Sequence, residues 1–270
     1  MKYLLSTIAD VDFKPVNETE EICYVRNTFP VANKYGLGLE LAEFCISDNM
    51  GATYNDVIDH FEYNRSNAAY VVLHAPYNEL MPHAIDQMVV DVARKRYEWT
   101  LQLCKKYDIK KIVVHANYVH SLYYPQWFVA RQIAFWKDFL YKHDDQVTIC
   151  IENVMEPNAD MLIDIIKAVD DPRLKMCLDV GHANLMQESP IEWLKKSYQY
   201  IDHYHIHNNK GPVEFDRPSL GDTHSALSDG IIDMKALLDL AEELTPNATA
   251  SVESYAIEES AMWLKENGYI

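Results

Sequence analysis

Imidazole and carboxylate side chains recur at the ends of short apolar segments along this 270-residue chain. Such groups are the ligands that proteins use for zinc, manganese, iron and magnesium. A single one at a segment end is usually a cap or a surface group, but chance rarely places them at six successive ends. The set therefore predicts a divalent-metal site. Its members are His74, His115, Glu152, Asp179, His182, His205, His207, Asp222, His224 and Glu253.

The apolar segments that carry these side chains are predicted to be strands. They are rich in Val, Ile and Leu and almost continuously apolar, as expected for parallel strands that helices cover on both faces. The predicted strands span residues 3–8, 37–44, 69–74, 111–115, 147–152, 175–179, 203–207 and 249–253.

Longer amphipathic segments alternate with the strands and are predicted to be helices. The first is expected to start at Asn17, where Asn17 and Glu20 match a capping box, and to continue through Phe29. Another, near 190–199, starts at Ser189 and Pro190, because Pro is favoured at the first helical position. The remaining helices are expected near residues 53–67, 83–107, 125–142, 158–169, 232–244 and 256–267.

The alternation of strands and helices predicts an α/β fold, a single (β/α)8 TIM barrel spanning residues 1–270. An open doubly wound sheet is the alternative, but it usually has fewer strands or a Gly-rich first turn. In a closed barrel the carboxyl ends of all strands face one mouth, so the metal-capable residues would converge there. The long segment 208–230 is expected to be a binding loop or lid.

The composition excludes several classes of partner. Lys and Arg total 24 against 41 Asp and Glu, a formal net charge of -17. A chain this acidic repels polyphosphate, so nucleic acid is not expected as a partner. No apolar stretch approaches the roughly 18 residues that span a membrane. The five Cys are scattered and odd in number, which favours free thiols in a cytoplasmic protein over disulfides.

Other titratable residues carry weaker signals. Glu40 and Glu43 either reach the mouth or lie on a solvated rim, and the sequence leaves both interpretations open. Most of a further group of histidines are expected at the surface. These are His60, His83, His120, His143, His203 and His207.

Seven short motifs, in order, resemble those of the xylose isomerase-like TIM barrels. This superfamily contains sugar and sugar-phosphate isomerases and epimerases, and also endonuclease IV. The motifs are LHAPY (73–77), VVHA (113–116), IENV (151–154), LDVGHA (178–183), YHIHNNK (204–210), GDTH with DGIID (221–233) and VES (252–254).

The resemblance implies a set of metal ligands. In the isomerases one divalent ion is typically held by two Glu, one Asp and one His, which match Glu152, Asp179, His205 and Glu253. His205 is preferred to His207 because it begins the matching His-x-x-x-x-Lys run, and the reverse choice stays open. The resemblance to endonuclease IV implies a three-zinc cluster and adds five ligands, His74, His115, His182, Asp222 and His224. Across both branches the expected cofactor is therefore one to three divalent ions per chain, zinc or manganese.

The first functional hypothesis is isomerisation or epimerisation of a small sugar or sugar phosphate. Glu152 and Glu253 would transfer the proton, and the metal would stabilise the enediolate. Candidate substrate-binding residues are Tyr77, His207, Lys210 and Arg217, the last two as a clamp for a terminal phosphate.

The alternative is metal-dependent hydrolysis of a phosphoester, which the full ligand set favours. A small phosphoester fits the acidic chain better than DNA does. A non-catalytic metal-binding barrel ranks last, because both acid–base glutamates are present. Barrels of this kind often pair, so a homo-oligomer is left open.

Overall fold

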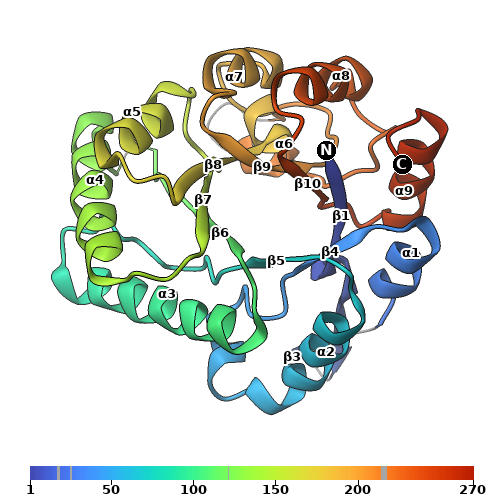
Figure 1. Cartoon of the computed structure of the whole chain (residues 1–270), viewed down its shortest axis with the longest axis horizontal. Helices are drawn as coiled ribbons and strands as arrows, with labels where there is room; N and C mark the ends of the chain where they lie inside the picture. Colours follow the sequence, from blue (N-terminus) through green and yellow to red (C-terminus); the bar gives the residue numbers. More distant parts are fainter. Residues whose placement is uncertain (17–18, 25, 121, 214–217) are drawn as a thin grey trace.

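Eight parallel strands close into a barrel, so the predicted (β/α)8 TIM fold is confirmed (Figure 1). The computed structural model describes residues 1–16, 19–24, 26–120, 122–213 and 218–270. Around the barrel the strand order is β1-β4-β5-β6-β7-β8-β9-β10. Their bounds are β1 Lys2–Ser6, β4 Gly38–Leu41, β5 Val71–His74, β6 Lys111–His115, β7 Thr148–Glu152, β8 Leu174–Asp179, β9 Ile201–Ile206 and β10 Thr249–Val252.

Helices form the outer layer of the barrel (Figure 1). Ser189 caps α7 as predicted, in a capping box with Glu192. None of the helices in the described ranges is long and apolar enough to cross a bilayer. Their bounds are α1 Thr28–Tyr35, α2 Tyr54–Asn67, α3 Gln87–Tyr107, α4 Pro125–Lys142, α5 Asp160–Val169, α6 Val180–Asn184, α7 Pro190–Ser197, α8 Met234–Leu244 and α9 Ile257–Glu266.

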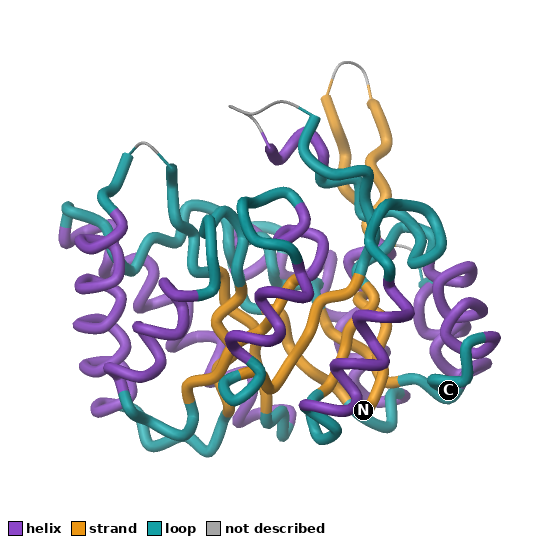
Figure 2. The backbone as a smooth tube through the Cα atoms, turned by 90° about the horizontal axis from the view of Figure 1, so that it is seen from above, coloured by secondary structure: helices purple, strands orange, loops and turns teal. Residues whose placement is uncertain are grey.

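The prediction of a helix that starts at Asn17 is wrong. Strands β2 (Val11–Val16) and β3 (Thr19–Tyr24) pair antiparallel there, and α1 begins only at Thr28. Asn17 itself lies outside the described residues. Thr, Ile and Tyr favour a pleated strand, and this preference outweighs a capping pattern of two residues. Figure 2 shows the hairpin projecting from the end of the barrel opposite the chain termini.

Large apolar side chains fill the space between the barrel and its helices, with Trp136, Trp193 and Tyr97 fully buried. Inside the barrel a much smaller apolar cluster packs across the strands. It consists of Leu4, Val72, Val113, Cys150 and Cys177. The rest of the barrel interior, towards the carboxyl ends of the strands, is therefore left to polar side chains.

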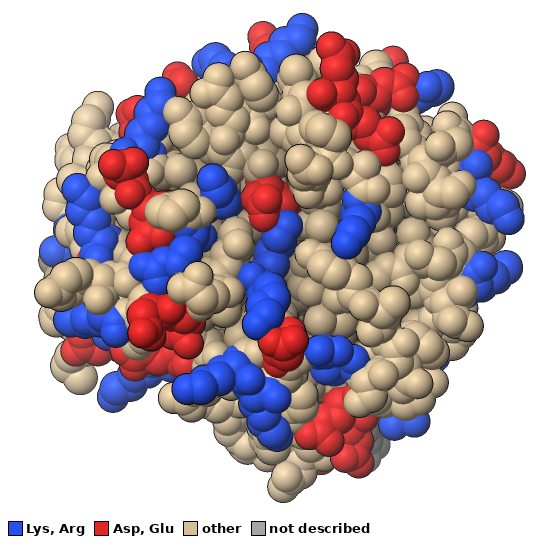
Figure 3. All heavy atoms as spheres, in the orientation of Figure 1, with Lys and Arg blue, Asp and Glu red and all other residues tan. Residues whose placement is uncertain are grey.

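Charges are mixed over the face of the molecule that Figure 3 shows. Lys and Arg are interspersed there with Asp and Glu. That face therefore lacks the basic stripe that nucleic-acid-binding surfaces use.

The expectation that most of the six remaining histidines lie at the surface is wrong. His60, His83, His203 and His207 are buried, and only His120 is exposed while His143 is half-buried. Each buried ring meets polar or aromatic neighbours that strands and helices far apart in sequence bring to it, so a local sequence pattern does not reveal its burial.

His60 on α2 is one of these buried rings and lies between two buried carboxylates. Its Nε2 is 3.1 Å from Asp10 Oδ2, and its Nδ1 is 2.8 Å from Glu43 Oε1. Burial by itself lowers the pKa of His60, but the hydrogen bonds to Asp10 and Glu43 outweigh it and raise the pKa to about 9. The ring is therefore protonated at neutral pH and joins the segment after β1 to the segment after β4.

We expect this cluster to make stability depend on pH. The pKa of His60 is raised above its unfolded value of about 6.5, so its contribution is complete below pH 6.5 and is lost as the pH rises to about 9. The wild type should lose roughly 2 to 3 kcal/mol more unfolding free energy than H60Q over this interval. Urea titrations at pH 6 and pH 9 measure this difference. Identical pH dependence in both proteins would contradict it.

Candidate metal centre

The strand register brings the predicted ligands together at one end of the barrel. His115 at the end of β6 pairs directly with Glu152 at the end of β7. Asp179 at the end of β8 pairs in the same way with His205 of β9. Because neighbouring strands lie about 4.8 Å apart, such paired residues present their side chains side by side. The predicted convergence follows from this register.

Glu152 lies at the centre of the group. Its Oε2 is 3.5 Å from His74 Nε2 and 3.2 Å from His115 Nε2. Its Oε1 is 3.3 Å from both His182 Nδ1 and His205 Nδ1. We call His74, His115 and Glu152 the His74 cluster. Each oxygen of this one carboxylate thus faces a different pair of imidazoles.

A second group, the His205 cluster, consists of Glu152, Asp179, His205 and Glu253. His205 Nδ1 lies 3.3 Å from Glu152 Oε1, 3.8 Å from Asp179 Oδ2 and 3.6 Å from Glu253 Oε2. All four side chains are buried. The sequence left the choice between His205 and His207 open, and it is His205 that lies among these three carboxylates.

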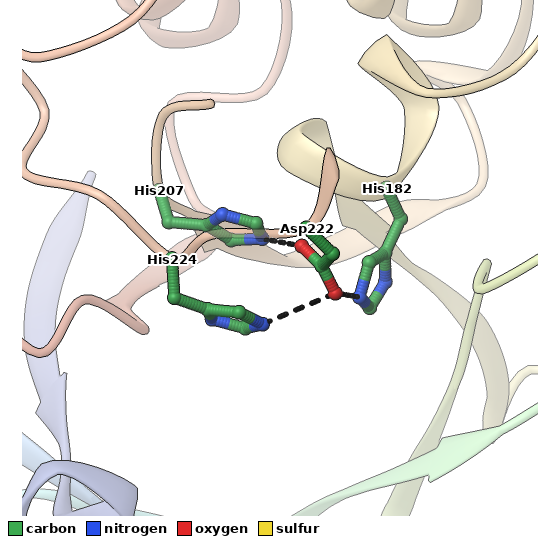
Figure 4. Close-up of side chains that lie close together, drawn as sticks. All are labelled: His182, His207, Asp222 and His224. Carbon is green, nitrogen blue, oxygen red and sulfur yellow. Dashed lines mark hydrogen bonds and ion pairs between the residues drawn. The ribbon is translucent and has the colours of Figure 1, made fainter. Parts of the chain in front are cut away.

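A third group, the Asp222 cluster, contains His182, His207, Asp222 and His224 (Figure 4). Asp222 Oδ2 is 3.1 Å from His182 Nε2 and 3.3 Å from His224 Nε2. His207 Nε2 is 3.8 Å from Asp222 Oδ1 and 3.2 Å from Asp179 Oδ1, so this ring lies between two clusters.

The long loop after β9 reaches the mouth because buried polar contacts fix its path. Asn208 pairs with Ser225 through two backbone hydrogen bonds. The Asn208 side chain donates to the carbonyls of Leu227 and Ile232. Gly181 leaves room for the His207 ring, since a Cβ there would lie 2.0 Å from His207 Cε1.

Backbone carbonyls determine which nitrogen of three histidines faces the clusters. Nδ1 donates to the carbonyl of Ala75 in His74, of Asn153 in His182 and of Glu253 in His224. When such a ring loses one of its two protons, the remaining proton stays on Nδ1, and Nε2 is the nitrogen free to bind an ion. Metal-binding histidines are usually held by such a second hydrogen bond.

The clusters fit divalent metal ions. In a tetrahedral site with bonds of about 2.0–2.1 Å, ligand atoms lie roughly 3.3 Å apart, close to the separations above. Several buried cluster atoms also make no hydrogen bond within the described residues. Leaving such atoms unpaired costs about 1–3 kcal/mol each, and a shared cation removes that cost. They are Glu152 Oε1 and Oε2, Asp179 Oδ2, His205 Nδ1, His207 Nε2 and Asp222 Oδ1.

The protonation states describe a centre held together by opposite charges. Burial raises the pKa of Glu152, but the imidazoles of His115 and His205 outweigh burial and hold it well below its usual range. For His224 burial lowers the pKa, and the hydrogen bond to Asp222 outweighs it and raises the pKa to about 9. Metal binding therefore has to displace protons from imidazoles, which makes it weaker at low pH.

A cavity of about 480 Å³ opens onto the clusters, a size typical of small-molecule sites. His74, His115, Glu152 and Glu253 line it, and Asn117 and Tyr255 lie on its wall. Among the described residues, no Lys or Arg lines this cavity.

The candidate substrate-binding residues lie in different places. Tyr77 lines the cavity and stacks on His115, with ring centroids 4.4 Å apart. Lys210 is exposed and its Nζ donates to Asp229, away from the cavity lining. Arg217 lies outside the described residues, so its role as a phosphate clamp stays a prediction.

The sequence left the position of Glu40 open between the barrel mouth and a solvated rim. Glu40 is fully buried and accepts hydrogen bonds from two histidines of β9. Its sequence signal was its place within a predicted strand, since β4 lies in the closed barrel and half of its side chains must point inward. Glu43, on the same segment, is also fully buried and contacts His60 through its Oε1, so neither residue lies on a solvated rim.

We expect zinc to stabilise the protein. Binding at 1,000 times Kd stabilises the folded state by about 4 kcal/mol, or about 10 °C in Tm for a chain of this size. H205A should show a smaller increase, whereas H120A, which changes an exposed histidine, should keep the full increase. Thermal unfolding with zinc and with a chelator measures this. An unchanged Tm in the wild type would argue against a metal centre.

Comparison with known proteins assigns the chain to a family. Residues 38–267 match the family described as xylose isomerase-like TIM barrel. The uncharacterized protein MJ1311 of Methanocaldococcus jannaschii is 25% identical over 206 residues, which is 70% of this chain and 66% of that protein, just under two thirds of its length.

Solved structures with the same fold superpose on this chain over almost its full length. A D-tagatose 3-epimerase-like protein superposes with a TM-score of 0.76 at 19% identity, covering 99% of this chain and 97% of the other. The IolI protein with a bound zinc atom superposes with a TM-score of 0.70 at 16% identity, covering 99% and 96%. The chain belongs to the xylose isomerase-like TIM-barrel family.

Proposed function

We propose that this protein is a divalent-metal-dependent isomerase or epimerase of a small sugar. The observation that carries the proposal is the position of Glu152 and Glu253. Both carboxylates lie within 3.6 Å of His205 Nδ1 and line the cavity, yet they come from the ends of β7 and β10, which two other strands separate. The likeness to a D-tagatose 3-epimerase-like protein supports the same chemistry.

Glu152, Asp179, His205 and Glu253 would hold the ion. A divalent ion bound there would polarise the sugar carbonyl and stabilise the negative charge of the enediolate. Glu253 would remove the proton from the carbon next to the carbonyl, and Glu152 would return a proton from the other side. Tyr77, which lines the same cavity, would donate a hydrogen bond to a hydroxyl group of the substrate.

The charge of the site favours an unphosphorylated sugar if one ion binds. Four carboxylates belong to the three clusters, Glu152, Asp179, Asp222 and Glu253. One divalent ion would neutralise only half of their formal charge, and no Lys or Arg of the described residues lines the cavity. Besides the ion, only protonated imidazoles such as that of His224 could then attract a phosphate dianion, whereas a neutral ketose requires no such charge.

A second candidate, hydrolysis of a small phosphoester, is favoured by a different observation. The Glu152 carboxylate is shared between the His74 and His205 clusters, and the Asp222 cluster lies beside them. With an ion in each cluster the site would become net positive, and ions there would activate a water and bind phosphate oxygens. Both Glu152 oxygens would then be ligands, so Glu152 would no longer be free to transfer protons.

We expect E253Q and E152Q to abolish solvent-deuterium incorporation into ketoses, because each removes one proton-transfer group, with rates falling by at least 100-fold. Mass spectrometry of a panel of ketoses incubated with the metal-loaded protein measures this. E79Q is the matched control, since Glu79 lines the cavity outside the clusters and should keep the wild-type rate. A wild-type rate in E253Q would remove Glu253 from the mechanism.

Metal stoichiometry separates the two candidates. The isomerase predicts one tightly bound ion per chain and exchange into ketoses, whereas the hydrolase predicts three ions and release of phosphate from small esters. Elemental analysis of untreated protein, combined with both activity assays, tests this. Three ions with ester cleavage and no exchange would refute the isomerase proposal.

A further inference from the structure

We propose that Glu40 is a positioning residue that fixes the tautomer of His205 and thereby sets the metal affinity of the His205 cluster. The inference rests on the metal site of the proposed function. Glu40 Oε1 lies 2.9 Å from His205 Nε2, whereas Glu152 and Glu253 contact Nδ1 of the same ring. The Glu40 and His205 side chains are both fully buried. A Glu40 oxygen also lies within 4.8 Å of donor atoms of His74 and Glu253.

His205 differs from the other histidines of the centre in how its ring is held. In His74, His182 and His224 a backbone carbonyl accepts from Nδ1, and Nε2 faces a carboxylate of the clusters. In His205 the acceptor is a side chain, and the cluster faces Nδ1 instead of Nε2. This contact can therefore be removed by a single substitution.

A chain of hydrogen bonds runs through the barrel interior and includes the contact between Glu40 and His205. It starts at Lys111, whose Nζ donates to Thr249 Oγ1 at 3.0 Å and pairs with Asp202 at 2.7 Å. Lysine has donors only, so the Thr249 hydroxyl accepts from it. The same oxygen lies 2.5 Å from His203 Nδ1 and 3.5 Å from the Asp202 carbonyl, so His203 is the nearer partner for its proton.

The hydrogen bonds continue from His203 through Glu40 to His205. Burial raises the pKa of Glu40, but the imidazoles around it outweigh burial and hold its pKa well below the usual range, so Glu40 is ionised. A carboxylate only accepts, so His203 Nε2 carries a proton and donates to Glu40 Oε2 at 2.7 Å. Glu40, as a carboxylate, also accepts from His205 Nε2 through its second oxygen. With its Nε2 proton held by Glu40, His205 would give up the Nδ1 proton to an ion, and Nδ1 is the nitrogen directed at Glu152, Asp179 and Glu253.

Glu40 acts through His205 and is not itself a ligand. Its distances of 2.7 and 2.9 Å to His203 and His205 are those of direct hydrogen bonds. They leave no space for an ion between the partners, since ligands of one ion lie about 3.3 Å apart. The pairing of His203 with Glu40 likewise leaves no space for a separate ion there.

The substitution E40Q tests the inference. A glutamine has one carbonyl and one NH2 group, so it can accept from only one of the two imidazoles. We expect the Kd of the His205 cluster for zinc to rise 10- to 100-fold, the usual effect of losing such a partner. Competition with a chromophoric chelator measures the Kd without any substrate.

The matched control is E43Q. Glu43 is also a fully buried carboxylate, lies three residues further along and accepts from His60 instead of His205. E43Q should keep the wild-type Kd even where its Tm falls as far as that of E40Q. An equal rise of Kd in both variants, or none in E40Q, would overturn the inference.

A second measurement needs no substitution. In the zinc-loaded wild type, nitrogen-15 NMR should place a proton on Nε2 of His205 and none on Nδ1, and zinc on Nε2 would overturn the inference.

A rise of Kd in E40Q without deuterium exchange into any ketose would sustain the role of Glu40 and refute the isomerase. A wild type that binds no zinc would refute both.

Discussion

Ionised carboxylates buried at the mouth of a closed barrel are the constraint on which this structure depends. Glu152 and Asp179 are fully buried, and such charges are expensive unless positive charge surrounds them. Imidazoles from β5, β9 and α6 have raised pKa values and supply that charge around Glu152, whereas burial lowers the pKa of His115 from β6. A divalent ion that binds among these rings would take the place of their protons. The same arrangement of side chains is therefore stable both without and with the ion.

The barrel interior is organised as layers of different polarity. The apolar cluster of Leu4, Val72, Val113, Cys150 and Cys177 occupies only part of it. A polar column from Lys111 through His203 and Glu40 to His205 passes beside this cluster. Such a column is stable only when every donor meets an acceptor, and it then orients the last ring of the series. The residues of this column therefore both fill the barrel interior and orient the His205 ring.

The number of bound ions and the charge of the substrate are linked in this centre. Carboxylates and imidazoles line the cavity, and the described residues contribute no Lys or Arg to its wall. The electrostatic sign of the cavity is therefore set by how many of the three clusters are occupied. The barrel by itself is compatible with both candidate chemistries, and the occupancy of the His74 and Asp222 clusters would distinguish them.

The sequence by itself determined the barrel and which carboxylate and imidazole side chains gather at its mouth. Continuous apolar runs ending in His, Asp or Glu were enough, because closure brings every strand end to one mouth. Only the tertiary structure decided that His205 and not His207 lies among Glu152, Asp179 and Glu253. It alone placed Glu40 behind His205 and folded the segment after β1 into a hairpin. These outcomes depend on register and side-chain direction between distant strands, which local periodicity and capping signals do not encode.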